Sequence, residues 1–322
     1  MLLGNRFRMK ILVTGAGGLL GGRIIDFLLR ECHKLIAVSR SYRGSLHWND
    51  GVQIVNADIN QTTDLYQYLD DVSVVIHAAG INASDSIANP SNALFFNGYV
   101  TAKLLQASID CNVKQFYYIS TTHVYSNILQ GVINEKSPVT NLHPYASSHK
   151  AGEDAVLFAH LENKIQGTVL RLSNTFGYPI NIKANCWMLL VNDLCRQAAE
   201  KGSLQLYSNG KQFRNFVSIT EVCKAIAYLI NLSEKNNNIS LINIASKNTI
   251  SVLNMAKIIQ RRAESIFGYK IPLFYPESSM IQACEPFILQ TTSLDQHKYS
   301  ISDDLTSEID ALLMYCKKVF NT

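Results

Sequence analysis

The sequence predicts an α/β fold with a doubly wound parallel sheet and a smaller C-terminal α/β lobe. Two observations support this prediction. Short β-rich apolar runs alternate with helical patterns over the first half of the chain, and the first of these runs leads directly into a glycine-rich turn. The chain has 322 residues, 47% of them hydrophobic, which is enough for a large α/β unit with an added lobe.

The predicted strands follow one another along the chain. They are KILVT from Lys10, KLIAVS from Lys34, VQIVNA from Val52, SVVIHAA from Ser73, QFYYIS from Gln115 and GTVLRL from Gly167. Parallel strands joined by right-handed connections have their carboxyl ends at one edge, and ligands bind at that edge. Beyond Gly177 the pattern is less regular. VCKAIAYLIN from Val222 still predicts an amphipathic helix, and SLINIAS from Ser240 predicts a strand that can return to the sheet.

The motif TGAGGLLG follows the first predicted strand and is typical of a dinucleotide-binding, Rossmann-type turn. Gly15 permits the sharp turn, Gly18 allows backbone to approach a pyrophosphate, and Gly21 allows the next helix to pack closely on the sheet. The next helix is predicted over residues 23–30. Leu19 and Leu20, in the turn that leads into it, are predicted to contact the cofactor, because free N–H groups at a helix N-terminus favour phosphate.

Composition and charge exclude several classes of protein. The net charge of +4 is mild and the basic residues are scattered, so nucleic-acid binding is not expected. No apolar run reaches the roughly 18 residues of a membrane span, and the residues before Met9, which is a possible alternative start to Met1, do not resemble a signal peptide. Seven dispersed cysteines without CxxC spacing argue against disulfides and a metal site, and predict a cytoplasmic protein.

Several motifs together resemble the extended short-chain dehydrogenase/reductases, in particular the nucleotide-sugar epimerases and dehydratases. Besides the glycine turn, the matching motifs are Asp58-Ile59, VIHAAG from Val75, STTHVY from Ser120, PYASSHKAGE from Pro144, LRLSNTFG from Leu170 and FRNFVSITEV from Phe213. The resemblance implies an NAD(P)-binding Rossmann domain over residues 1–175, with return elements near 216–246. Residues 176–215 and 247–322 would form a substrate-binding lobe, and the protein would be a homodimer.

For the cofactor, the resemblance implies that Asp58, followed by Ile59, contacts adenine. The backbone of Ala78, Ala79 and Gly80 would run along the cofactor.

Four further positions concern cofactor binding. Asn97 matches an asparagine of the family. It can have a catalytic role, or it can be a buried polar group that ties a helix to the sheet, and the sequence supports both equally. An acidic residue at the end of the second strand would signal NAD, but Ser39 and Arg40 occupy that place, with Arg43 nearby. A guanidinium can hold a 2′-phosphate, so NADP is preferred, although NAD stays possible if the arginines are solvated surface charges.

Tyr145 matches the family tyrosine that handles the substrate proton during hydride transfer. A free phenol has a pKa of about 10, so a base near neutrality needs stabilisation of its phenolate. In the family a lysine four residues later supplies it, but here that residue is His149, and Lys150 follows. Residues four apart share a helix face, so His149 faces Tyr145 and Lys150 does not.

His149 allows two interpretations. It can anchor the cofactor and, if protonated, lower the pKa of Tyr145, which keeps an active enzyme. As a neutral imidazole it leaves Tyr145 too basic, and the chain becomes a non-catalytic NADP-binding sensor or partner protein.

The substrate residues also follow from the resemblance. Thr121 matches the Ser/Thr that hydrogen-bonds the reacting oxygen, while Thr122 and His123 stand where the 4,6-dehydratases carry an Asp-Glu pair. Dehydration needs an acid and a base, so it is disfavoured relative to 4-epimerisation or keto-sugar reduction. Asn174 and Arg214 match positions that contact a nucleotide diphosphate.

The sequence therefore predicts an NAD(P)-dependent nucleotide-sugar epimerase or keto-sugar reductase of surface-polysaccharide or glycoconjugate biosynthesis. The alternatives are the non-catalytic protein described above and a reductase of non-nucleotide carbonyl compounds.

Overall fold

A parallel sheet of seven strands forms the centre of the protein, in the order β11-β7-β5-β4-β1-β2-β3. The computed structural model describes residues 9–40, 48, 51–60, 62–233, 239–277 and 285–320. Arg43 and the segment before Met9 lie outside these residues. The strands are β1 (Lys10–Thr14), β2 (Lys34–Ser39), β3 (Val52–Asn56), β4 (Val74–His77), β5 (Gln115–Thr121), β7 (Gln166–Leu172) and β11 (Leu241–Ile244).

This sheet confirms the predicted fold class. All six runs from the first half of the chain are strands, and each pairs with its neighbour in parallel. The later run at Leu241–Ile244 returns to the sheet beside β7, as expected.

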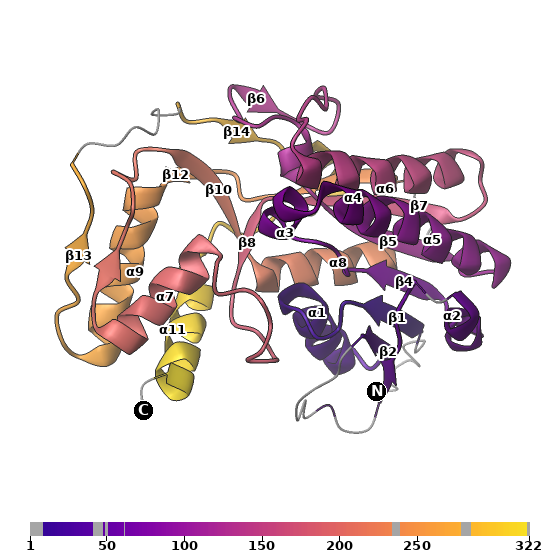
Figure 1. Ribbon diagram of the computed structural model, residues 1–322, viewed down its shortest axis with the longest axis horizontal. Helices are drawn as coiled ribbons and strands as arrows, with labels where there is room; N and C mark the ends of the chain where they lie inside the picture. Colours follow the sequence, from indigo (N-terminus) through magenta and orange to yellow (C-terminus); the bar gives the residue numbers. More distant parts are fainter. Residues whose placement is uncertain are drawn as a thin grey trace.

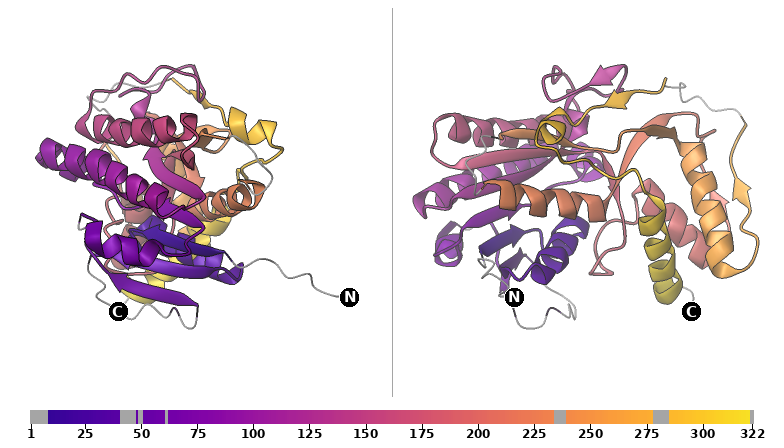
Figure 2. Two further views of the ribbon diagram at one scale, coloured as in Figure 1. Left: turned by 90° about the vertical axis from the view of Figure 1, so that its right-hand side faces the viewer. Right: turned by 180° about the vertical axis from the view of Figure 1, so that it is seen from behind.

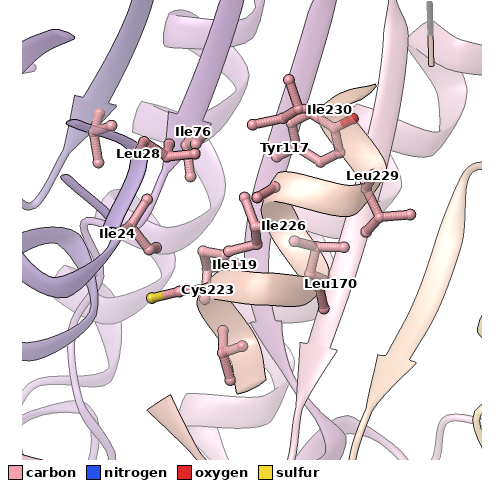
Figure 3. Close-up of a cluster of buried hydrophobic side chains, with 14 of the residues drawn as sticks. Ile24, Leu28, Ile76, Tyr117, Ile119, Leu170, Cys223, Ile226, Leu229 and Ile230 are labelled. Carbon is pink, nitrogen blue, oxygen red and sulfur yellow. The ribbon is translucent and has the colours of Figure 1, made fainter. Parts of the chain in front are cut away.

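Two layers of helices cover the sheet (Figures 1 and 2). On one face lie α1 (Leu19–Arg30) and α8 (Ile219–Ser233). Figure 3 shows their side chains, among them Ile24, Leu28, Cys223 and Ile226, meeting strand residues such as Ile76. Apolar burial of this kind stabilises the fold by about 25 cal/mol per Å².

The other face packs against α2 (Thr62–Leu69), α5 (Thr101–Asp110) and α6 (Pro144–Leu161). Between α4 (Pro90–Ala93) and α5 the chain forms a π-helix, η1 (Leu94–Val100). Gly98 on η1 lets α6 approach closely, because a Cβ at Gly98 would lie only 3.1 Å from Ala151 Cβ.

Helix α1 begins earlier than its apolar pattern predicts, at Leu19 rather than near Arg23. The first turn contains Gly21 and Gly22, which are poor helix formers. Tertiary packing overrides that propensity, since both glycines are buried against the turn at Gly15 and Ala16.

The C-terminal lobe has its own core. Helices α7 (Leu190–Lys201), α9 (Val252–Phe267) and α11 (Thr306–Phe320) pack together through residues such as Leu194, Met255 and Leu312. A three-stranded sheet of β8 (Asn174–Phe176), β10 (Phe213–Ser218) and β12 (Thr249–Ser251) lies beside them. The remaining elements are α3 (Ala83–Ala88), η2 (Thr122–Val124), α10 (Thr292–Gln296), the pair β6 (Val132–Ile133) and β14 (Ile288–Leu289), and the pair β9 (Leu204–Gln205) and β13 (Leu273–Phe274).

A buried ion pair joins the two parts. Arg23 on α1 donates to Glu308 on α11 at 2.8 Å and to the backbone oxygen of Tyr178 at 3.0 Å. The domain boundaries at residues 175, 216 and 246 stay a prediction.

Within the described ranges, none of the helices combines the length and the apolar character needed to cross a bilayer.

Candidate active site

A cavity of about 730 Å³ lies at the carboxyl ends of the central strands and extends to the C-terminal lobe. Its lining includes fourteen of the residues that the sequence singles out: Gly15, Gly18, Leu19, Leu20, Gly21, Ala78, Ala79, Gly80, Thr121, His123, Tyr145, His149, Asn174 and Arg214. Both lobes contribute, because β8, β10 and the first turn of α7 supply other wall residues.

The glycine turn forms a close-packed backbone wall. Gly15 has φ +71°, and a Cβ there would lie 2.8 Å from the Ala78 carbonyl carbon. A Cβ at Gly21 would lie 2.3 Å from the Gly15 oxygen. No side chain caps the start of α1 at Gly18, and its first turn has no acidic residue. The free N–H groups and the helix dipole therefore fit the pyrophosphate of a dinucleotide.

The positions predicted for the adenosine end lie beside this wall rather than in the cavity lining. Ser39 ends β2, and a Cβ at Gly17 would lie 3.0 Å from its hydroxyl oxygen. The exposed Arg40 guanidinium lies 5.5 Å from the ring centre of Phe96. Asp58 accepts a hydrogen bond from the backbone N–H two residues later, and Ile59 is buried.

Asn97 is buried on η1 and ties two elements together. Its Oδ1 accepts from the Ile81 N–H at 2.8 Å, and its Nδ2 donates to Ser148 Oγ at 3.0 Å. The side chain is thus used to hold the loop after β4 against α6, which favours the structural interpretation.

Tyr145 and His149 lie on the first turns of α6. Pro144 suits the first helical position, and His143 Nδ1 accepts from the Tyr145 N–H at 3.2 Å. The rings of Tyr145 and His149 meet edge to face, 4.7 Å between centres. Lys150 instead forms an ion pair with Asp154, on a different side of the helix, as the helical spacing predicts.

Burial controls the protonation of both groups. It raises the pKa of the Tyr145 phenol above 10, although a hydrogen bond with Thr121 acts in the opposite direction. It also lowers the pKa of His149 to about 4. At neutral pH the imidazole is therefore uncharged and provides no positive charge to stabilise a Tyr145 phenolate.

The substrate side contains polar groups from both lobes. His123 lies 6.5 Å from Tyr145 between ring centres, and burial with the nearby Arg214 and His143 lowers its pKa. Thr122 is buried and is not in the cavity lining. Asn174 lines the cavity, but its Nδ2 donates to a backbone oxygen of β10 at 2.8 Å.

Sequence reasoning missed the groups beneath this surface. Glu153 is fully buried, and it accepts from Ser120 Oγ at 2.5 Å and from Arg171 Nη2 at 2.6 Å. This contact links α6 to the ends of β5 and β7. Glu153 and Arg171 lie within two of the matched motifs, so their opposite charges were an available signal.

Tyr118 is the second group that was missed. It is buried on β5, and its hydroxyl lies 3.0 Å from His149 Nδ1. Nothing in the sequence distinguishes it from the neighbouring Tyr117.

Comparisons with known proteins show which family the chain resembles. A protein of Methanocaldococcus jannaschii, provisionally named a UDP-glucose 4-epimerase, is 29% identical over 80% of this chain and 85% of its own length. The mouse dTDP-D-glucose 4,6-dehydratase is 27% identical over 78% of this chain and 72% of its own. The structure of a Bacillus cereus UDP-glucuronic acid 4-epimerase with UDP-glucuronic acid and NAD is 25% identical, with a TM-score of 0.79 over 97% of this chain and 100% of its own.

The family itself is shown by the match of residues 11–245, which spans the whole seven-stranded sheet except for part of β1. The protein belongs to the NAD-dependent epimerase/dehydratase family of extended short-chain dehydrogenase/reductases.

Proposed function

We propose that the protein is an active nucleotide-sugar 4-epimerase, with reduction of a keto-sugar as the other reaction that the same residues support. Because His149 is neutral, the Tyr145 phenolate would be stabilised by the hydrogen bond with Thr121 and by the positive nicotinamide ring of the bound cofactor. One observation carries the proposal. A single cavity contains the glycine turn, Tyr145 with its hydrogen-bonding partner Thr121, and Arg214 from the other lobe.

The cofactor would be held by the glycine turn and by the backbone of Ala78 to Gly80, and when bound it supplies a hydride acceptor and donor. Tyr145 would hold and exchange the proton of the sugar hydroxyl on the carbon that is oxidised and reduced. Thr121 donates a hydrogen bond to the reacting oxygen. The same Tyr145 hydroxyl would give the proton back when the epimer forms.

Arg214 is proposed to hold the diphosphate, because a planar guanidinium can form two parallel bonds to phosphate oxygens. Asn174 would complete this end of the site through the part of its amide that does not bond to β10.

Dehydration is disfavoured by Thr122 and His123. A neutral threonine cannot exchange a proton with carbon, and Thr122 does not reach the cavity wall. His123 alone supplies one titratable group where two are needed.

We propose NADP as the preferred cofactor, with NAD as the alternative. Ser39 carries no charge that would repel a 2′-phosphate, and the exposed Arg40 lies next to it. The similar Bacillus cereus structure contains NAD, so the preference needs a direct test.

We also propose a cytoplasmic homodimer. Four exposed apolar side chains lie on the neighbouring helices η1 and α6: Phe95, Tyr99, Phe158 and Leu161, with exposed fractions of 44%, 54%, 60% and 73%. A second copy of this face would bury them. The nucleotide sugar that the proposed reaction forms would be used in surface-polysaccharide or glycoconjugate synthesis.

The test is turnover by the purified protein with NADP(H) and NAD(H), offered UDP-, GDP- and dTDP-sugars and their 4-keto derivatives. Formation of an epimer supports the proposal and identifies the sugar, whereas reduction of only the keto derivatives supports the reductase. Cofactor binding without any chemistry across pH would indicate the non-catalytic protein. Turnover of carbonyl compounds without binding of nucleotide diphosphates would indicate the third alternative.

A further inference from the structure

We propose that Tyr118 holds His149 in its Nδ1–H tautomer, so that Nε2 faces the cofactor side of the cavity as a hydrogen-bond acceptor. Tyr118 is then a positioning residue. The identity of the ligand hydroxyl that meets Nε2 rests on the proposed function, but the tautomer does not.

The inference begins at Asn97, whose backbone oxygen can only accept. Thr101 Oγ1 donates to it at 2.7 Å, and Tyr118 Oη donates to it at 3.1 Å. A carbonyl oxygen has two lone pairs, so both donors are accommodated.

The contacts of His77 are consistent with this direction of the Thr101 proton. Thr14 Oγ1 accepts from the Ala79 N–H at 3.2 Å and lies 2.7 Å from His77 Nδ1. His77 Nε2 lies 3.1 Å from Thr101 Oγ1. If Thr14 donates to His77 Nδ1 and His77 Nε2–H donates to Thr101, every proton in this buried series of hydrogen bonds has one acceptor.

Tyr118 has one proton, and Asn97 O and His149 Nδ1 compete for it. The Thr101 hydroxyl also lies within hydrogen-bonding reach of Tyr118, but it donates its own proton to Asn97 O. If the proton points to Asn97 O, the phenol oxygen is free to accept from His149 Nδ1–H at 3.0 Å. If instead Tyr118 donated to an unprotonated Nδ1, its lone pairs would face the Asn97 oxygen at 3.1 Å. The first arrangement makes two hydrogen bonds and the second makes one beside an oxygen-oxygen repulsion, so the first is favoured.

The other nitrogen of His149 points towards the cavity. A Cβ at Gly80 would lie 3.7 Å from His149 Cε1 and 3.9 Å from Nε2, and both residues line the cavity. Among the described residues, Nε2 has no hydrogen-bond partner in the protein. Glycine at position 80 keeps this edge of the ring accessible.

The charge state agrees with the geometry, because burial keeps His149 neutral at neutral pH. An ammonium group at the same place could only donate. His149 Nε2 therefore accepts a hydrogen bond from a ligand hydroxyl, whereas a lysine at this position would donate one. The exchange between lysine and histidine here reverses the hydrogen bond.

The experiment is ¹⁵N NMR of histidine-labelled protein without cofactor, since protonated and unprotonated imidazole nitrogens resonate far apart. The spectrum of His149→Gln identifies the His149 signals among the eight histidines. We expect a protonated Nδ1 and an unprotonated Nε2 at pH 7. A protonated Nε2, or two protonated nitrogens, would overturn the proposal.

The role of Tyr118 is tested by Tyr118→Phe, with Tyr117→Phe as the matched control. Tyr117 is equally buried on β5, and its hydroxyl bonds to Gln115. We expect only Tyr118→Phe to convert the His149 signals to a mixture of tautomers, and to weaken NAD or NADP binding about three- to tenfold, the loss expected for one hydrogen bond. Unchanged His149 signals would refute the role of Tyr118.

Titration with NAD and NADP separates this inference from the proposed function. A shift of the Nε2 signal on binding supports the acceptor role even in a protein without turnover. Binding that leaves the Nε2 signal unmoved refutes that role even in an active enzyme.

Discussion

The two walls of the central cavity are constructed differently. The glycine wall consists of backbone, and its shape is fixed by contacts that leave no room for a Cβ, such as 2.3 Å from the Gly21 position to the Gly15 oxygen. The wall on α6 consists of side chains, and its chemistry depends on the protonation of Tyr145 and His149.

This difference shows which part of the site tolerates change. A backbone wall offers the same N–H groups whatever side chains surround it, and only added volume can damage it. In the side-chain wall, the neutral His149 stands where the resemblance implies a positively charged lysine, so the electrostatics of this wall differ from those the family pattern implies. The contribution of the glycine wall should therefore depend on volume, and that of the α6 wall on charge and tautomer.

The largest effect is expected at the side-chain wall. Tyr145→Phe removes the group that we propose exchanges the substrate proton, so kcat should fall about 10²- to 10⁴-fold while cofactor affinity changes little. Steady-state kinetics and a binding titration check this. Tyr269→Phe, at a half-exposed position of the C-terminal lobe outside the cavity lining, is the control. An equally active Tyr145→Phe would mean that another group handles the proton.

At the backbone wall, Gly21→Ala should weaken cofactor binding about 100-fold and lower Tm, because the added Cβ meets backbone that cannot move aside cheaply. Gly22→Ala is the control, since a Cβ there meets its nearest atom, the Ala16 oxygen, at 3.3 Å. Binding titrations and thermal unfolding of both variants measure the contrast. Similar behaviour of the two variants would show that close packing does not govern this wall.

A smaller effect is expected at Arg40, beside the glycine wall. If its guanidinium holds a 2′-phosphate, Arg40→Ala should weaken NADP about tenfold and NAD less than about twofold. Dissociation constants for both cofactors test this, with the exposed Arg30→Ala as control. Equal losses for the two cofactors would remove the argument for NADP.

The smallest effect concerns stability and pH. The folded pKa of His149, about 4, lies below its unfolded value of about 6.5. The unfolded chain therefore takes up the proton first, so this contribution is present above pH 6.5 and is lost as pH falls towards 4. Wild type should lose up to about 1.4 kcal/mol more per pH unit than His149→Gln in that window.

Urea unfolding of both proteins at pH 8, 7, 6 and 5 measures this slope. The difference between them should be constant from pH 8 to 7 and should change below that. Parallel curves down to pH 5 would show that His149 is not held neutral by the fold.

The sequence by itself determined the sheet and the place of the site. Short apolar runs such as KILVT and QFYYIS are typical of buried strands. The glycines of TGAGGLLG permit the backbone conformation of the turn. The position of Tyr145 four residues before His149 also predicted that the two share a helix face, with ring centres now 4.7 Å apart. These features depend on spacing along the chain, which a sequence contains in full.

Only the tertiary structure decided the protonation and partners of those groups. Whether His149 is charged depends on its burial, and its tautomer depends on Tyr118 and the oxygen of Asn97, which come from other elements. The role of Asn97 as a tie between the β4 loop and α6 has the same origin. Desolvation and hydrogen-bond geometry are sums over neighbours distant in sequence, so residue types and their spacing alone do not determine them.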